Sequence, residues 1–202
     1  MKLYTSLGPN PHVVRFFLSE KGIEIPLEQV DVIRGENREP AHLVRNPHGQ
    51  TPALELDNGH YLNEITAICE YIEEIHPTPA LIGSTPEERA ETRMWTRRVD
   101  LNICEPLTNG FRYAEGLALF RPRMVTIPEA ADGLKRIARD RLQWLDGQMQ
   151  GRRFLCGERF TLADIILYCF VDFGSKRGQT LDPALANVTV WFERIAARPA
   201  AI

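Results

Sequence analysis

The residues best suited to covalent chemistry are four cysteines, Cys69, Cys104, Cys156 and Cys169. A zinc site usually needs closely spaced cysteine pairs, and a cysteine nucleophile needs a lowered thiol pKa. No two of these cysteines form a CxxC pair, and their spacing fits no common zinc motif. Cys69 and Cys169 lie in apolar helical patterns, which predicts buried thiols, whereas Cys156 adjoins a glycine turn and is expected to be more exposed. We therefore expect no metal and no cysteine nucleophile.

Composition limits the class of protein and its partners. The chain has 202 residues, a net charge of −3, 44% hydrophobic and 25% charged residues, which is typical of a folded globular protein. A nucleic-acid partner is not expected, because such surfaces need an excess of Lys and Arg. No apolar run approaches the roughly 20 residues of a membrane span, and the N-terminus lacks the apolar core of a signal peptide. We expect a cytoplasmic protein with no membrane partner.

Patterns of strands and helices predict an α/β domain over residues 1–77. Alternation and turn signals favour strands at 1–6, 27–32, 53–56 and 60–62, with helices at 11–21, 39–45 and 64–75. Asn10 is the expected N-cap of the first helix and Pro11 its first residue. Four isoleucines, at 65, 68, 72 and 75, predict one buried stripe along the last helix.

A linker is expected over residues 78–86, which are rich in proline and glycine, followed by an all-α domain over 87–202. Three segments resemble helix starts, at Thr85, Thr126 and Thr161, each with an acidic residue three positions later. Pro106 is expected to kink or end the first helix of this domain. Four or five helices are predicted, with Asp164 as a structural cap.

Four motifs carry a resemblance to a known family. Residues 46–54 (NPHGQTPAL), 62–72 (LNEITAICEYI), 160–164 (FTLAD) and a closing helix at 191–199 resemble, in order, the NPxGxxPxL, LxESxAIxxYL, capping and C-terminal motifs of the cytosolic glutathione transferases. Each motif is weak alone, but together they cover nearly the whole chain. The opening residues and the EITAICEYIEE helix are most similar to the bacterial and fungal branch of the family.

The resemblance implies a thioredoxin-like N-terminal domain, a helical C-terminal domain and a homodimer. It also implies glutathione as co-substrate on the first domain, with a small hydrophobic electrophile in an apolar cleft between the domains. The implied activity is conjugation of the glutathione thiolate to electrophiles, and could extend to peroxide reduction. The alternatives are a glutathione-dependent isomerase, dehalogenase or disulfide reductase on the same fold, or a non-catalytic binding or assembly module.

The family pattern maps the glutathione site onto Gln50, Thr51, Pro52, Glu64 and Ile65. Pro52 would follow a cis peptide bond, and the main chain of Thr51 would pair with the extended tripeptide as an added strand. Gln50 would approach the glycyl carboxylate. The Glu64 carboxylate and the helix N-terminus would hold the γ-glutamyl ammonium and carboxylate. Ile65 stands where most relatives have serine, so only its N–H can serve.

The residue that activates the thiol is the least determined part of the site. Asn10 lies where relatives carry a catalytic hydroxyl, and its amide could donate to the thiolate or could merely cap the helix. Thr5 and Ser6 are expected to lie too early, on the strand. Backbone N–H groups or an ordered water are further alternatives. For the electrophile pocket we expect Asn109 and Tyr113, with Trp95, Phe111 and Arg112 as further candidates; Tyr113 could also reach the thiol or simply line the core.

Overall fold

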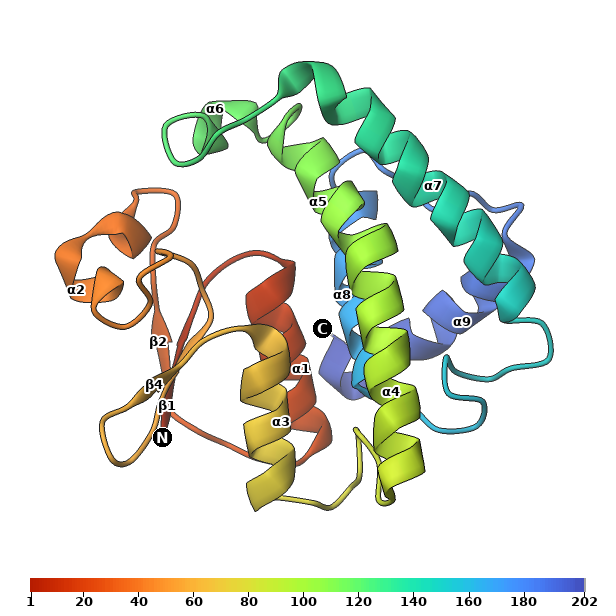
Figure 1. Cartoon of the computed structure of the whole chain (residues 1–202), viewed down its shortest axis with the longest axis horizontal. Coiled ribbons are helices and arrows are strands. Elements are labelled where there is room, and N and C mark those ends of the chain that lie inside the picture. The colour runs from red at the N-terminus through yellow and green to blue at the C-terminus, as the bar shows by residue number, and fades with distance from the viewer. Residues whose placement is uncertain (202) are drawn as a thin grey trace. The chain divides into compact units, whose positions relative to one another are not determined.

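The computed structural model describes residues 1–201, and the chain divides into two compact units, residues 1–81 and the remainder from Ile82 onward (Figure 1). The division falls within the 78–86 segment. Among the described residues, no helix combines the length and apolar character that crossing a membrane requires.

The first unit contains a four-stranded mixed sheet. Its strand order is β2-β1-β3-β4, with bounds β1 Lys2–Thr5, β2 Leu27–Gln29, β3 Ala53–Glu55 and β4 Tyr61–Leu62. Strand β1 pairs parallel with β2 and antiparallel with β3, and β3 pairs antiparallel with β4. A tight turn joins β3 to β4, where Gly59 has a φ of 81° that glycine adopts without strain.

Two helices pack side by side on one side of this sheet, and a shorter helix lies on the other (Figure 1). The helices of this unit are α1 Pro9–Glu20, α2 Pro40–Leu43, preceded by a 3-10 turn at Glu36–Arg38, and α3 Ile65–Ile75. Apolar side chains from β1, β3, α1 and α3 fill the space between sheet and helices, among them Leu3, Phe17, Leu54, Ile68 and Ile72, all fully buried. This core fixes the ends of the strands, where the candidate site lies.

Helix α1 begins earlier than the sequence predicts. Its first residue is Pro9, and its N-cap is Gly8 with a φ of 116°, so Asn10 is not the N-cap and Pro11 is not the first helical residue. The reason is that both prolines fit the first turn, where a missing N–H costs no intrahelical hydrogen bond. Glycine at position 8 supplies the unusual backbone angle that starts the helix earlier.

The expected isoleucine stripe of α3 is shorter than predicted. Ile68 and Ile72 are fully buried, but Ile75 is 42% exposed. Glu73 is buried instead and forms an ion pair with the buried Lys21 of α1. Lys21 also donates to the carbonyl oxygens of residues 76 and 79, at 2.7 and 2.6 Å. A buried charge needs such partners, and this pair ties α1 to the end of α3.

The helices and turns described up to residue 201 make up the regular structure of the second unit, apart from two isolated β-bridges at Phe154–Gly157 and Cys156–Arg159. Its helices are α4 Pro86–Val99, α5 Glu105–Arg112, α6 Leu117–Phe120, α7 Ala131–Gln148, α8 Leu162–Ser175 and α9 Ala186–Ala196, with 3-10 turns at Pro128–Ala130 and Pro199–Ala201. Helix α8 is the core element, because every residue from Leu162 to Val171 is buried. It packs against α4, α5 and α9.

Pro106 does not end the first helix of this unit, because α4 already ends at Val99. A π-helical turn at Asp100–Cys104 joins α4 to α5, and Pro106 lies in the first turn of α5. The Glu105 N–H donates to the Asp100 carbonyl five residues earlier, which widens this turn. Pro106, which follows, has no N–H and so could not donate a hydrogen bond within the helix. Thr126 is also not a cap: Ile127 precedes a 3-10 turn, and α7 starts at Ala131.

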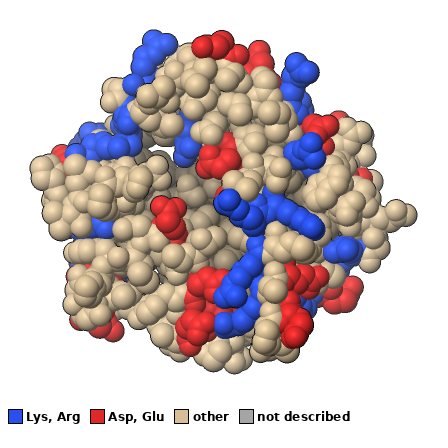
Figure 2. All heavy atoms as spheres, in the orientation of Figure 1, with Lys and Arg blue, Asp and Glu red and all other residues tan. Residues whose placement is uncertain are grey.

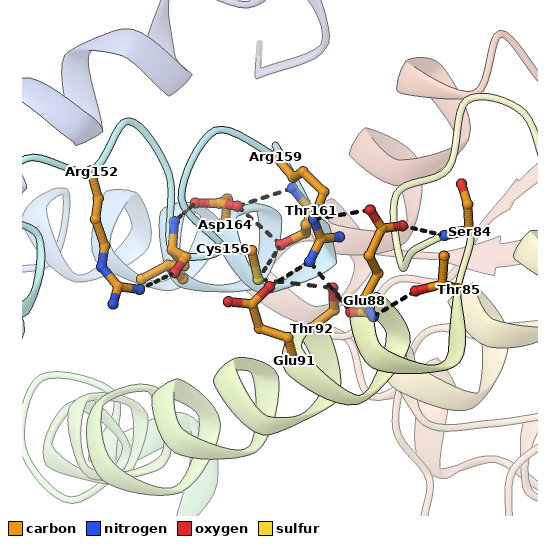
Figure 3. Close-up of polar contacts among 11 residues, drawn as sticks. Ser84, Thr85, Glu88, Glu91, Thr92, Arg152, Cys156, Arg159, Thr161 and Asp164 are labelled. Atoms are coloured by element: carbon orange, nitrogen blue, oxygen red, sulfur yellow. Dashed lines mark hydrogen bonds and ion pairs between the residues drawn. The ribbon is translucent and has the colours of Figure 1, made fainter.

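Asp164 caps α8 as predicted and does more than cap it (Figure 3). Its carboxylate accepts the N–H groups of Thr161 at 3.0 Å and Leu155 at 2.9 Å, the Thr161 hydroxyl at 3.0 Å and the Trp191 indole N–H at 2.9 Å. Burial raises the pKa of Asp164, and these donors oppose the rise by stabilising the charged form. One side chain thus joins the start of α8, the preceding loop and α9.

All four cysteines are buried and reduced, including Cys156, which the glycine turn had suggested would be exposed. Cys156 is 5% exposed because it packs between α4 and the start of α8, 3.8 Å from the Thr92 hydroxyl and 3.7 Å from that of Thr161. Burial raises the pKa of the Cys104 and Cys156 thiols, which favours the protonated, unreactive form.

Candidate functional site

A loop before β3 is held in shape by three buried side chains. The Asn37 amide donates to the Gly49 carbonyl at 2.6 Å. The Gln50 carbonyl accepts two bonds, from His42 Nε2 at 2.8 Å and from Asn46 Nδ2 at 3.0 Å. Asn37, His42 and Asn46 are each 5% exposed or less. The carbonyls that precede Thr51 are therefore satisfied from within the unit, which fixes the backbone that leads to it.

Thr51 has an unpaired backbone at the end of this loop. Within residues 1–201, its N–H and C=O take part in no hydrogen bond of the chain. The peptide bond from Thr51 to Pro52 is cis. A residue with both main-chain groups free, next to a strand and held by a fixed loop, can pair with an extended peptide as one more strand would.

Strand registers bring other residues to the same end of the sheet. Tyr4 pairs with Ala53 and Leu54 with Leu62, both in antiparallel register. Extending the first register places Ser6 opposite Thr51. The hydroxyl oxygens of Ser6 and Thr51 are indeed 2.5 Å apart.

Helix α3 begins at this end of the sheet with an exposed acid. Glu64 is its N-cap residue and has a φ of 67°, a conformation that costs a non-glycine residue free energy. Its side chain does not cap the helix. Within the described chain, the N–H groups of Ile65, Thr66 and Ala67 have no acceptor. The geometry offers three N–H donors for a ligand carboxylate and one carboxylate for a ligand cation.

Helix α1 offers only one backbone donor in its first turn. Pro9 and Pro11 have no N–H, and the His12 N–H already donates to Gly8 at 3.4 Å. Among residues 1–201, the N–H and side-chain amide of Asn10 make no hydrogen bond. Asn10 thus presents both a backbone and a side-chain donor at the positive end of α1. His12 is half-buried and stacks on Phe16.

Ser6 was expected to lie too early on the strand to matter, but its hydroxyl lies beside Thr51. It follows the last residue of β1 and is 4% exposed. The preceding hydroxyl, that of Thr5, accepts a bond from Arg15 at 2.6 Å. Only the β1–β3 register could have identified Ser6, because the two segments are 45 residues apart in sequence.

The expected electrophile residues lie together at the end of α5. Asn109 accepts a bond from Arg112 at 3.0 Å and donates to Glu105 at 3.0 Å. Tyr113 is the C-cap residue of α5 and is half-buried. Trp95 is almost fully buried in α4, where it contacts Trp144 of α7 at a ring distance of 6.2 Å. Trp95 is therefore a core residue of the second unit.

Charges of both signs are mixed on one face of the molecule. On the face shown in Figure 2, Lys and Arg side chains are interspersed with Asp and Glu. This agrees with the net charge of −3, and a ligand here would be recognised by local groups and not by a long-range field.

We call the three buried side chains that hold the loop before β3, Asn37, His42 and Asn46, the loop clamp. Its role can be tested with Asn46→Ala, which removes one donor to the Gln50 carbonyl and the acceptor of the His48 N–H. We expect a destabilisation of about 1–2 kcal/mol, because the Thr51 backbone would lose its fixed position. For the same reason, binding of glutathione, the ligand that the sequence resemblance implies, should weaken by about three- to ten-fold. Thermal denaturation and calorimetric titration measure the two effects.

The matched control for this test is Asn58→Ala. Asn58 accepts the His60 N–H at 3.0 Å, as Asn46 accepts that of His48, but it lies in the exposed β3–β4 turn. Its replacement should leave glutathione binding unchanged. Equal losses of affinity in the two variants would contradict a specific role for the clamp.

Comparisons with known proteins follow the division of the chain. A family model described as "Glutathione S-transferase, N-terminal domain" matches residues 1–74, and one described as "Glutathione S-transferase, C-terminal domain" matches residues 112–199. Glutathione S-transferase 2 of Saccharomyces cerevisiae is 30% identical over 202 residues, which covers 96% of this chain and 84% of the yeast protein.

Two further proteins extend this result. The structure of a glutathione S-transferase domain-containing protein from Marinobacter aquaeolei matches with a TM-score of 0.94 and 32% identity, and covers all of both chains. A maleylacetoacetate isomerase of Pseudomonas aeruginosa is 43% identical over 112 residues, 54% of this chain and 52% of the isomerase. The predicted pairing of a thioredoxin-like domain with a helical domain is confirmed. The chain therefore belongs to the glutathione S-transferase family and has its glutathione-binding fold.

Proposed function

We propose that this protein is a glutathione transferase that joins the glutathione thiolate to small electrophiles. The observation that carries the proposal is the unpaired backbone of Thr51, which the buried clamp holds in place beside β3. An extended tripeptide needs such a partner for its central residue, because its own N–H and C=O lose water on binding.

The ends of the tripeptide have partners in the same unit. The uncapped first turn of α3 receives the γ-glutamyl carboxylate, and Glu64 receives the ammonium group. Gln50 is exposed and reaches toward the glycyl carboxylate. Ile65 contributes its backbone N–H, so the absence of a serine hydroxyl reduces the number of bonds without removing the site.

The thiol is activated by stabilising its ionised form. A free thiol has a pKa of about 8.5 and is only a few per cent ionised at pH 7. The two donors of Asn10 at the N-terminus of α1 favour the thiolate. The sulfur then attacks an electrophilic carbon, a C–S bond forms, and the leaving group departs with its electron pair. The thiol proton passes to solvent. Asn109 and Tyr113 of the second unit contact the electrophile.

A glutathione analogue methylated on its cysteinyl nitrogen tests the backbone pairing directly. We expect it to bind at least about ten-fold more weakly than glutathione, because it cannot donate to the Thr51 carbonyl. Calorimetric titration measures both affinities. S-methylglutathione, which keeps the N–H and also carries one added methyl group, is the control and should bind more tightly than the N-methyl analogue. Equal binding of the N-methyl analogue would refute the pairing.

Turnover separates the proposed reaction from its alternatives. Chlorodinitrobenzene and glutathione should give chloride and the conjugate faster than without protein. Binding without conjugation, combined with cis–trans isomerisation of an unsaturated diketo acid, would favour an isomerase, which the 43% identity to the Pseudomonas enzyme supports as the second candidate. Binding with neither reaction would favour the non-catalytic module. The homodimer and the cytoplasmic location belong to this proposal and rest on the family resemblance.

A further inference from the structure

Arg112 is a half-buried cation that pairs with no carboxylate within residues 1–201. It lies in the last turn of α5. Burial lowers the pKa of Arg112, and the charge of Glu105 opposes this. The guanidinium still stays protonated, because its ordinary pKa lies far above neutrality. A cation removed from water in this way is costly unless an anion joins it.

The donors of this guanidinium are only partly used. Nη1 donates to the Asn109 side-chain oxygen at 3.0 Å. Nε is buried and has no hydrogen-bond partner among the described residues. Nη2 makes no hydrogen bond to residues 1–201 and is not among the fully buried nitrogens. Nη2 is therefore the donor of this edge that remains open to a ligand oxygen. A hydrogen bond between two charged groups, such as a guanidinium and a carboxylate, is about twice as strong as one between neutral groups.

The acid whose charge acts on Arg112 forms no ion pair with it in the described chain. Glu105 accepts the Asn109 amide N–H at 3.0 Å, which turns the Asn109 oxygen toward Arg112. Asn109 thus holds the guanidinium in place through one nitrogen while Glu105 stays one side chain away. The hydrogen bonds from Asn109 to Glu105 and from Arg112 to Asn109 thus orient the guanidinium without neutralising its charge.

One aromatic ring adjoins the guanidinium and packs in turn against two others. Its central carbon lies 5.7 Å from the centre of the Phe120 ring. Phe120 and Phe173 both meet Phe111 edge to face, with ring centres 6.1 and 5.0 Å apart. A flat apolar molecule that carries an anion would match this combination of cation and aromatic side chains.

We propose that Arg112 binds a carboxylate on the electrophile, so that the preferred acceptors are aromatic or unsaturated carboxylic acids. As a statement about catalysis this rests on the proposed transferase function; as a statement about binding it does not. A purely structural arginine at a helix C-terminus would interact with the last carbonyls of α5 and would not distinguish an acid from its ester.

The test uses a chloronitrobenzoate, with chlorine para to the carboxylate, and its methyl ester. Equilibrium dialysis without glutathione measures binding of each compound to the full-length protein. We expect the acid to bind at least about ten-fold more tightly than the ester. Arg112→Gln should remove this preference, and a circular dichroism spectrum and melting temperature like those of the wild type show that the variant is folded. Arg112→Lys, which keeps the charge but not the planar guanidinium, should retain only part of the preference for the acid.

Arg121→Gln is the matched control, because it removes one positive charge from the exposed segment after α6. It should keep the full preference for the acid. Equal binding of acid and ester by the wild type, or a preference that survives Arg112→Gln, would overturn the proposal.

Conjugation assays then separate this proposal from the proposed function. The thiolate sulfur bonds to the carbon that carries chlorine, the C–Cl bond breaks, and chloride leaves with its electron pair. Because the ester is intrinsically more reactive, rates are compared as wild type over variant, and only the acid should show a ratio of about ten or more. Acid-selective binding without any conjugate would reject the transferase and keep the Arg112 site. Conjugation of both compounds, with a wild-type-to-variant rate ratio near one for the acid, would keep the transferase and reject the Arg112 site.

Discussion

Replacing Asp164 with alanine is expected to prevent stable folding of the second unit. The substitution leaves the Thr161 N–H and hydroxyl without their acceptor (Figure 3). The Leu155 N–H and the Trp191 indole N–H also lose theirs. Each buried donor left unsatisfied costs about 1–3 kcal/mol. Several such losses together rival the roughly 5–15 kcal/mol that stabilises an ordinary domain. Circular dichroism during heating, together with the yield of soluble protein, measures the effect.

Two further variants show whether the loss comes from the hydrogen bonds. Asp164→Asn keeps the size of the side chain and one acceptor oxygen, but its NH₂ group would lie against N–H or O–H donors. It should therefore be more stable than Asp164→Ala and less stable than the wild type. Asp182→Ala removes an acid that accepts the Ala184 N–H at 2.9 Å in an exposed loop, and should change the stability by less than about 0.5 kcal/mol. If Asp164→Ala unfolded within about 1 kcal/mol of wild type, the joining role assigned to this carboxylate would be wrong.

Glu64 should show opposite effects on stability and on binding. Its φ of 67° costs about 1–3 kcal/mol in a non-glycine residue. Glu64→Gly removes this cost as well as the carboxylate, whereas Glu64→Ala removes only the carboxylate. We expect both variants to bind glutathione about ten- to a hundred-fold more weakly, because the ligand ammonium loses its charged partner. The glycine variant should be the more stable by about 1 kcal/mol.

The measurements for Glu64 are calorimetric titration with glutathione and denaturant unfolding of both variants. Glu24→Ala removes an exposed acid from the loop before β2 and controls for net charge. It should affect neither quantity. Unchanged affinity in Glu64→Ala would refute the assigned ligand role, and equal stability of the alanine and glycine variants would show that the backbone relaxes at no cost.

Local patterns were sufficient to predict most elements of the fold. Hydrophobic periodicity identified α3, and the Asn-Gly turn identified the β3–β4 hairpin, because both depend on residues close in sequence. The predicted start of α1 is two residues too late. Asn10 and Pro11 suit the N-cap and first position, but Gly8 and Pro9 suit them equally well, and local patterns do not separate the two choices. The π-helical turn before Pro106 depends on packing that no local pattern encodes.

The candidate site was predictable where it lies in one segment and not where it joins several. Residues 50–52 and Glu64 came from contiguous motifs. The Ser6 hydroxyl and the buried donors His42 and Asn46 were missed, because their positions depend on strand register and on the path of the loop. The unpaired donors of Arg112 could not be predicted either, since they depend on which partners Asn109 and Glu105 take.

The unpaired backbone of Thr51 has a consequence for evolutionary drift at this position. N–H and C=O groups are common to every residue except proline, so a ligand held by them does not depend on the side chain present. The loop conformation depends instead on Gly49, which has a φ of +60°. A Cβ added there would lie 2.8 Å from the Asn37 carbonyl oxygen. Mutational scanning should therefore find position 51 permissive to most residues other than proline, and position 49 intolerant of nearly all.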